Sequence, residues 1–223
     1  PYFGLEFFNP SSMYEPALKV AGALKMARQT VADFLGGVEP SEVLFTSCAT
    51  ESNNAALFGV AAANPQRKHI VTSVVEHPAV LEVCRELQRR GHEVTYLPVD
   101  RRGQIATADY VRALRPDTLL VTLMHANNET GVVWPVGDWA RIAKETDQHI
   151  VFHTDATQTA GKLPLALRGS GPLCWTMRAG WSRASKARPR RPRPARRACA
   201  PSRRSASSPR PRAPSAATAS APP

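Results

Sequence analysis

The sequence has no acidic residue after Asp155, and it has no Val, Ile, Phe or Tyr after residue 167. Residues 168–223 instead contain 13 Arg and one Lys, and Arg, Pro, Ala and Ser make up 44 of these 56 residues. The +14 charge of this segment exceeds the +11 of the whole chain, so residues 1–167 are net negative. The basic character therefore belongs to the last quarter of the chain, and we do not expect residues 1–167 to bind nucleic acid.

Cysteine is also scarce, and the four that occur show no CxxC spacing. This pattern favours neither a zinc site nor a disulfide framework, so we expect no metal and a reducing, cytoplasmic setting. No run of about 18 apolar residues is present, which excludes a typical transmembrane helix. The first residues lack a basic stretch followed by an apolar one, so we expect no signal peptide and no membrane partner.

In residues 1–167, short β-branched runs alternate with helical patterns. Most of the strand-like runs are apolar nearly throughout, which is typical of strands buried on both faces. The expected strands cover residues 42–47, 69–75, 93–99, 118–126 and 149–156, and the expected helices cover 15–35, 51–63, 78–90, 107–115 and 136–146. This alternation predicts an α/β fold with a mainly parallel sheet flanked by helices. Ligands of such sheets bind at the carboxyl ends of the strands.

Residues 168–223 offer little apolar surface to bury, so we expect a disordered tail. Three origins are compatible with its composition: a basic RNA-binding arm, a linker, or a GC-rich coding region translated in the wrong frame. We favour the wrong frame because the change falls abruptly where an α/β domain should supply its next strand. The expected domains are thus 1–167, folded, and 168–223, an out-of-frame tail.

Two polar motifs follow the expected strands in the first half of the chain. In SCATESNN, residues 47–54, small and hydroxyl residues open a helix, whose N-terminal N–H groups could hold a phosphate. The alternative is simple helix capping by Thr50 or Ser52. In VVEHPAV, residues 74–80, His77 precedes a helix that starts with Pro78. His77 could act on a ligand or be only a satisfied loop histidine.

Two more motifs follow later strands. In MHANNETG, residues 124–131, the amides of Asn127 and Asn128 could bind a ligand or build a turn. In HTDATQ, residues 153–158, Asp155 ends an apolar strand, where a carboxylate is costly unless it is paired. A pyridinium nitrogen would be a suitable partner, because an acid there keeps the ring an electron sink. The alternative is a helix N-cap.

Taken together and in this order, the motifs resemble those of the cysteine desulfurases, which are fold type I pyridoxal-phosphate enzymes of aminotransferase class V. The likeness is closest to the branch that serves nitrogenase cluster assembly. It covers residues 1 to about 167, and its matching stretches are NPSSMYEPA (9–17), FTSCATESNN (45–54), TSVVEHPAVLEVC (72–84), LPVDRRGQI (97–105), ANNETGVV (126–133) and FHTDATQTAGKLPL (152–165). The resemblance implies part of the large cofactor domain of such an enzyme.

The resemblance also implies roles for individual residues. Thr50, with the backbone at Ala49, would hold the phosphate of pyridoxal 5'-phosphate. His77 would stack on the pyridine face and move protons, as the catalytic residue. Asp155 would pair with the pyridinium nitrogen. Two further residues complete the expected site: Gln158 at the phenolic oxygen of the ring, and Asn128, helped by Asn127, near the ring hydroxyl and the substrate.

The family converts L-cysteine to L-alanine and passes the sulfur as a persulfide to an iron–sulfur scaffold protein. Its members are homodimers. The resemblance therefore implies these partners and a role in iron–sulfur cluster assembly. Two alternatives stay open: another class V enzyme, such as a selenocysteine lyase or an aminotransferase, and a basic RNA-binding protein that acts through its tail.

The chain also departs from the family. It starts downstream of the family's Asp-Asn-Asn-Ala-Thr-Thr motif, so we expect an N-terminal truncation. It has no Ser-Gly-His-Lys motif, whose lysine anchors the cofactor, and Lys186 lies in a different context. The family's acceptor-cysteine loop is missing too, and we expect Cys48 and Cys84 to be buried packing thiols. We therefore expect this chain to be inactive.

Overall fold

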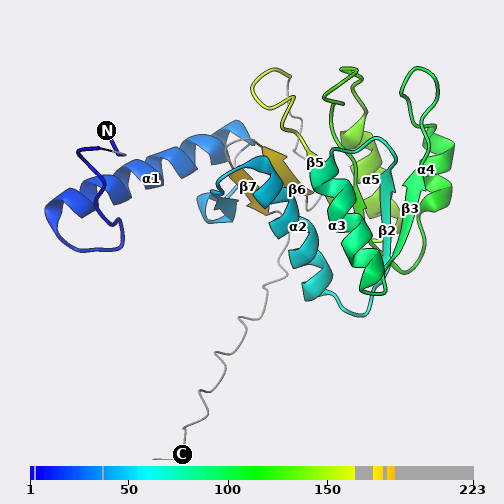
Figure 1. The fold of residues 1–223 in the computed structure, drawn as a ribbon, viewed down its shortest axis with the longest axis horizontal. Helices are drawn as coiled ribbons and strands as arrows, with labels where there is room; N and C mark the ends of the chain where they lie inside the picture. Colours follow the sequence, from blue (N-terminus) through cyan, green and yellow to red (C-terminus); the bar gives the residue numbers. More distant parts are fainter. Residues whose placement is uncertain (3, 37, 164–172, 178–179, 184–223) are drawn as a thin grey trace, which may run out of the picture. The chain divides into compact units, whose positions relative to one another are not determined.

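The computed structural model describes residues 1–2, 4–36, 38–163, 173–177 and 180–183. Helices and strands alternate along the chain, as the hydrophobic pattern predicts (Figure 1). The helices are α1 (Glu15–Phe34), the 3-10 turn η1 (Pro40–Glu42), α2 (Ala49–Ala63), α3 (Pro78–Arg89), α4 (Thr107–Ala113) and α5 (Val136–Thr146). The strands are β1 (Val43–Leu44), β2 (His69–Ser73), β3 (Glu93–Leu97), β4 (Thr118–Thr122), β5 (Val151–Asp155), β6 (Leu173–Met177) and β7 (Gly180–Arg183).

The described strands form a seven-stranded sheet in the order β1-β7-β6-β5-β4-β2-β3. The strands β2 to β6 pair in parallel, whereas β7 runs antiparallel to both of its neighbours, β6 and β1. Parallel neighbours require a crossover, and here α3, α4 and α5 each return the chain to the starting edge of the sheet. The expected mainly parallel α/β fold is confirmed.

Both faces of the sheet are buried, which explains why the strands are apolar without alternation. Ile70 and Leu120 pack on one face in a cluster with α2 and α3. The residues next to them in sequence, Val71 and Val121, pack on the other face with Trp139 of α5. The central strands β2 and β4 are fully buried along their whole length.

The chain beyond Thr122 continues alongside β5, although the regular ladder ends there. The amide of Leu123 donates to the carbonyl of His153 (3.1 Å), and the amide of His125 donates to that of Asp155 (3.0 Å). The regular strand is therefore shorter than the expected 118–126 and ends at Thr122. The residues that follow still run alongside β5. This pairing brings the MHANNETG segment to the carboxyl end of β5.

The first expected strand and the tail both differ from the structure. Only Val43 and Leu44 of the expected strand 42–47 pair with a neighbour, which is β7, because the chain turns into α2 from Cys48. Residues 173–177 and 180–183, which lie within the expected tail, are described as strands. These residues extend the sheet beyond β5 as β6 and β7. The rest of the expected tail, including Lys186, lies outside the described residues.

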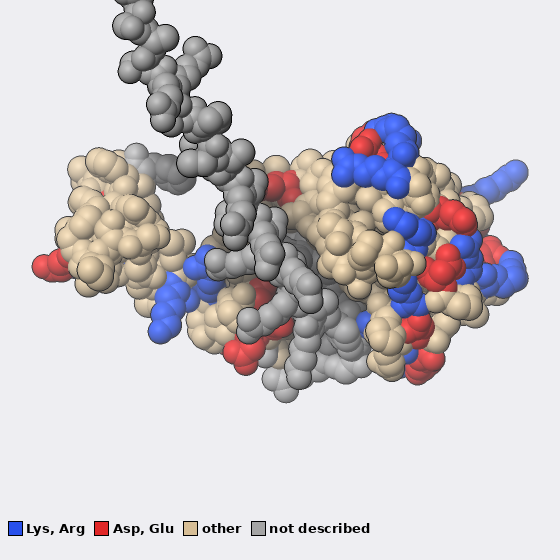
Figure 2. Space-filling view, turned by 90° about the horizontal axis from the view of Figure 1, so that it is seen from below, with Lys and Arg blue, Asp and Glu red and all other residues tan. Residues whose placement is uncertain are grey.

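Charged side chains of both signs are interspersed on the face of the molecule that Figure 2 shows. In the described part of the chain, several charged side chains form ion pairs within one helix turn, such as Arg85 with Glu82, and Arg89 and Arg90 with Glu86. Exposed pairs of this kind contribute about 0–1 kcal/mol each, so they are mainly a solvated surface. No helix in the described part of the chain has the length and apolar character needed to cross a membrane.

Replacing Leu120 by Ala should strongly destabilise the fold, because Leu120 is fully buried in the central strand β4. Truncating a buried leucine costs about 2–5 kcal/mol of unfolding free energy. Urea denaturation followed by circular dichroism measures this loss. The control is Val111→Ala on α4, where the side chain is 46% exposed and the change should stay within about 0.5 kcal/mol. Equal effects of the two changes would contradict the described core.

Candidate functional site

A cavity of about 330 Å³ opens at the carboxyl ends of the parallel strands. This size lies at the lower end of the range for small-molecule sites, about 300–1,000 Å³. Its walls come from the starts of α2 and α3 and from the segments that follow β4 and β5. The lining residues are Cys48, Ala49, Thr50, Asn53, His77, Ala79, Met124, Ala126, Asn128, Asp155, Thr157 and Gln158. All six residues that the sequence predicted as the site are among them.

The wall from α2 consists of the first turn of the helix. Cys48 is the N-cap residue in extended conformation, and no side chain caps the helix. The expected alternative, capping by Thr50 or Ser52, is therefore wrong; Ser52 instead bonds the hydroxyl of Thr46 (2.6 Å). The first N–H groups of a helix lack intrahelical partners and attract anions. The start of α2 is thus available to bind a phosphate at the cavity.

Cys48 lies exposed on this wall, so the expectation that it is a buried packing thiol is wrong. The backbone N–H of Glu51 and then the hydroxyl of Ser47 hold the pKa of the Cys48 thiol below its ordinary value. Cys84, by contrast, is buried as expected, and burial raises the pKa of its thiol to about 12. Of these two thiols, only that of Cys48 borders the cavity.

His77 is the N-cap of α3, and its Nδ1 accepts a hydrogen bond from the amide of Ala79 (3.1 Å). A ring nitrogen that accepts must be unprotonated, so the proton of the neutral imidazole lies on Nε2. Both interpretations of His77 are therefore compatible. Its Nδ1 is hydrogen-bonded as a helix cap, and the residue also lines the cavity. Capping fixes the ring's orientation and leaves Nε2–H as a donor.

Asp155, the last residue of β5, is half-buried and held at both carboxylate oxygens. Its Oδ2 accepts from Asn53 Nδ2 (2.8 Å), and its Oδ1 accepts from the amide of Thr157 (3.0 Å). The second bond is the turn contact expected of a capping residue. The first bond joins residues 102 apart in sequence. A carboxylate held in this way is oriented for a cationic partner in the cavity.

Asn53 was not predicted from the sequence, although its position gives a signal. It lies four residues after Ala49, so both are on the same face of α2. Asn53 must turn Nδ2 towards Asp155, because the opposite rotamer would bring two oxygens together. Its Oδ1 is then buried without a partner, as is Oγ1 of Thr157. An orphaned buried acceptor costs about 1–3 kcal/mol, so these atoms favour a polar ligand in the cavity.

The two asparagines after β4 are used differently. Asn128 is exposed, lines the cavity and donates to Glu129 Oε1 (2.7 Å). Asn127 is not among the lining residues. Its Oδ1 accepts from the amides of Glu129 (3.0 Å) and Thr130 (2.9 Å), which makes it a turn builder. The expectation that Asn127 helps Asn128 at the ligand is therefore wrong, and the turn alternative holds for it.

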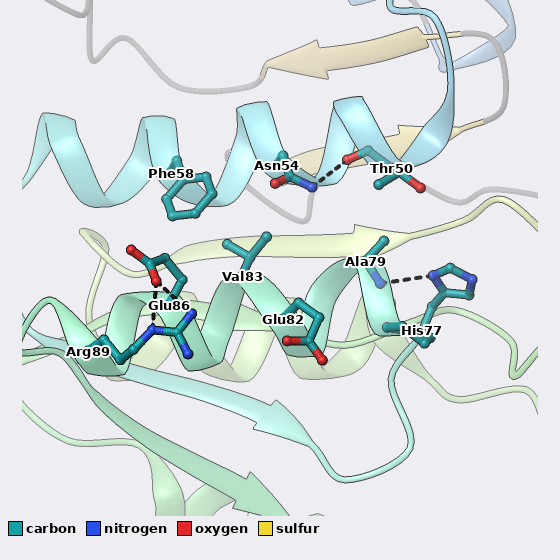
Figure 3. Close-up of a pocket in the computed structure, with 10 residues that line it drawn as sticks. Thr50, Asn54, Phe58, His77, Ala79, Glu82, Val83, Glu86 and Arg89 are labelled. Carbon is teal, nitrogen blue, oxygen red and sulfur yellow. Dashed lines mark hydrogen bonds and ion pairs between the residues drawn. The ribbon is translucent and has the colours of Figure 1, made fainter.

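A second, more open groove of about 450 Å³ adjoins the cavity and runs between α2 and α3 (Figure 3). The two hollows share Thr50, His77 and Ala79. The groove continues along Phe58, Val83 and the Glu86–Arg89 ion pair. The groove and the cavity therefore adjoin at the first turns of α2 and α3.

No lysine lines the cavity among the described residues. Among the lysines of the described residues, Lys144 is the one with a clearly lowered pKa, about 8, and the cause is burial. However, its Nζ donates to the carbonyls of Gln148 (3.0 Å) and Ile150, just before β5 begins. That is the opposite end of β5 from Asp155. Nor does any group of three His, Cys, Asp or Glu side chains in the described part suit a metal ion.

Two buried ionisable groups lie behind the cavity. Burial lowers the pKa of His153 to about 4, and its Nδ1 bonds the hydroxyl of Thr122 (2.8 Å). Burial raises the pKa of the Glu76 carboxyl to about 8, and the nearby Asp155 carboxylate raises it further. A charge on Glu76 would also raise the pKa of the Cys84 thiol. Both groups are therefore mainly neutral near pH 7.

Comparison with known proteins gives one consistent picture. The family model "Aminotransferase class-V" matches residues 2–171. Cysteine desulfurase 2 of Trichormus variabilis is 48% identical over 170 residues, which cover 76% of this chain and 42% of that protein. Cysteine desulfurase NifS of Azotobacter vinelandii is 46% identical, with the same coverage. The chain thus spans less than half the length of these curated relatives.

Solved structures agree with this similarity. A structure titled "NIFS-LIKE PROTEIN" superposes with a TM-score of 0.77 at 35% identity, covering 84% of this chain and 54% of the other. One titled "SspA in complex with cysteine" gives a TM-score of 0.74 at 38% identity, covering 81% and 54%. The matched part of this chain carries the cavity described above.

The buried state of Glu76 predicts a pH dependence of stability. The pKa of Glu76 is about 8 in the folded chain, well above its ordinary value of 4.5, so the folded state binds the proton more tightly. Its contribution to stability is full below about pH 4.5 and is lost as the pH rises towards 8. In urea denaturation from pH 5 to 9, the stability of the wild type relative to Glu76→Gln should fall as pH rises. A constant difference would contradict the buried, neutral Glu76.

Proposed function

Since the chain belongs to the aminotransferase class-V family, we propose that it is the cofactor-binding part of a pyridoxal-phosphate-dependent cysteine desulfurase. One observation carries the proposal. A half-buried carboxylate, an uncapped helix N-terminus and a capping histidine meet in one cavity of about 330 Å³, from three segments of the sequence. These are the groups that a phosphorylated pyridine ring requires: a partner for its nitrogen, a phosphate cradle and a proton carrier.

The residues present fit the cofactor except for its covalent anchor. Asp155, oriented by Asn53 and Thr157, would pair with the ring nitrogen. Thr50 and the N–H groups at Ala49 would hold the phosphate at the start of α2. The unpartnered oxygens of Asn53 and Thr157 lie beside the same cavity and would accept hydrogen bonds from a ligand or its water. Gln158 and Asn128 stand at the rim, where we assign them to the oxygen on the ring and to the substrate.

His77 is the residue to which we assign proton transfer. Because Nδ1 is occupied by the amide of Ala79, only Nε2 can donate or accept a proton towards the cavity. Bound pyridoxal phosphate supplies an electron sink for the negative charge that develops on the substrate. The carboxylate of Asp155 would keep the ring nitrogen protonated, and the fixed imidazole would hold or move a proton at Nε2.

We propose L-cysteine as the substrate, L-alanine as the product and an iron–sulfur scaffold protein as the acceptor of the sulfur. The names of the relatives support the reaction, and both branches of the family are similarly close. NifS of Azotobacter vinelandii is 46% identical, and IscS of Dictyoglomus turgidum is 48% identical. Within this proposal the SCATES (47–52) and VVEHPAV (74–80) motifs favour a desulfurase over another class V enzyme, and we keep nitrogenase cluster assembly as the proposed use of the sulfur. The free thiols of Cys48 and Cys84 support a cytoplasmic setting.

We also propose that the intact protein is a homodimer, as family members are. The N-terminal segment supports this, because large apolar side chains are exposed along it. Examples are Leu5 (86%), Phe7 (74%), Met13 (90%) and Met26 (70%). Apolar side chains gathered on a surface in this way are typical of interaction sites. Analytical ultracentrifugation would measure the association.

This chain should bind pyridoxal phosphate without a covalent bond, and Asp155→Ala should weaken that binding about 10- to 100-fold. The estimate follows from the loss of a hydrogen bond to a charged group, about 1.5–3 kcal/mol. A fluorescence or absorbance titration measures the affinity. Asp138→Ala on α5 is the matched control, since that carboxylate is 71% exposed in its ion pair with Arg141. Equal affinities for the two variants would overturn the role of Asp155.

We further propose that residues 168–223 are translated from the wrong frame. The sequencing of the DNA across codons 160 to 223 should reveal, in another frame, an apolar strand that ends in Ser-Gly-His-Lys. Protein from the restored frame should then release alanine from cysteine, whereas this chain should not. If no frame encodes the lysine motif, the frameshift is refuted. If the present chain releases alanine and forms a persulfide, its assignment as inactive is wrong.

A further inference from the structure

Two segments deliver His77 and Asn128 to the cavity: residues 74–77 after β2, and residues 123–131 after β4. Side chains tie these segments together in both directions. From the first segment, Glu76 reaches the second, where both of its oxygens accept from the amide of Met124 (3.1 Å each). Glu76 is only 4% exposed, and its Oε1 also accepts from the hydroxyl of Ser73 (2.8 Å).

The opposite contact comes from the second segment. Asn127 Nδ2 donates to the carbonyl of Val75 (3.2 Å) in the first segment. Its Oδ1 simultaneously accepts from the amides of Glu129 and Thr130 and from the hydroxyl of Thr130 (3.0, 2.9 and 3.1 Å). A single side chain thus shapes the turn that carries Asn128 and anchors this turn to the end of β2.

Neither Glu76 nor Asn127 lines the cavity, but each directly precedes a residue that does. Glu76 precedes His77, and Asn127 precedes Asn128 in the chain. We propose that Glu76 and Asn127 are positioning residues, which form a reciprocal clasp that fixes His77 and Asn128 relative to each other. The contacts of the clasp do not depend on the proposed function. Only the roles of His77 and Asn128 at a bound cofactor rest on it.

Glu76 is buried, so its carboxyl group costs desolvation free energy that a side chain used only for packing would not cost. Its hydrogen-bond partners are neutral donors, the Ser73 hydroxyl and the Met124 amide, and an apolar side chain of equal volume would avoid the desolvation of a carboxyl group. What the carboxyl adds is the pair of bonds across to Met124. In the protonated form, its O–H can donate to Ser73 while the other oxygen still accepts from Met124. Glutamine has the same shape and can make both contacts, with Nε2 as the donor.

The clasp is tested by hydrogen–deuterium exchange of the full chain, in the variants Glu76→Leu, Asn127→Ala and Glu76→Gln. The net worth of such a bond, about 0.5–1.5 kcal/mol, corresponds to a change of roughly 2- to 12-fold in local opening. Glu76→Leu and Asn127→Ala should each accelerate exchange by this factor in both segments, 74–77 and 123–131. Glu76→Gln should restore the wild-type rates. The matched control is Glu145→Leu on α5, where the side chain is 62% exposed.

The decisive result is that each change loosens the segment it does not belong to. If Asn127→Ala accelerates exchange only in residues 123–131, or if Glu76→Leu leaves 123–131 unchanged, the clasp is refuted. If Glu76→Leu does not fold, Asn127→Ala alone still tests the clasp through the exchange rates of residues 74–77. A pyridoxal-phosphate titration of the same variants gives a second readout: affinity should fall with both losses and recover with Gln. If the wild type fails to bind the cofactor, the proposed function fails, but the exchange result still decides the clasp.

Discussion

Everything at the site depends on one constraint of the backbone, the parallel pairing of β2, β4 and β5. Parallel neighbours end at the same edge of a sheet, so the segments that follow them meet there whatever their distance in sequence. The fully buried β2 and β4 hold this edge rigid, because side chains from helices pack on both faces. The bond between Asn53 and Asp155 and the contacts between Glu76 and Met124 then tie these neighbouring segments together.

This constraint explains which parts of the site the sequence predicts. The polar residues that directly follow apolar strands, such as His77, Asn128 and Asp155, are visible as breaks in the pattern, and the structure gathers them in one cavity. Asn53 is different, because its partner lies 102 residues away and no local pattern marks the pair. Glu76 is hidden for a similar reason: the amide of Met124 that it meets belongs to another strand end.

The structure corrects the sequence-based expectations mainly where a side chain could bond either to its neighbours in sequence or to groups far away in sequence. Asn127 and Asn128 carry identical side chains, and only the fold shows that the first is engaged by the turn and by Val75. Cys48 looks like a packing residue by type, yet it stands exposed at the N-cap because α2 starts two residues earlier than its apolar pattern indicates. The strands β6 and β7 were not predicted, since the composition around them carries no strand pattern.

The position of β6 bears on whether a lysine could reach the cavity. It pairs in parallel with β5, and Thr176 stands beside Asp155, so its carboxyl end meets the same edge as the cavity. A lysine that follows this strand would be brought to the edge of the sheet where Asp155 lies. Residues 173–183 contain no lysine, and Lys144 is committed to the opposite end of β5. The described part of the chain therefore combines the residues proposed for non-covalent cofactor contacts with no lysine at the cavity. Within the proposed function, a pyridoxal-phosphate titration of this chain therefore tests the non-covalent contacts, such as those of Asp155 and the start of α2.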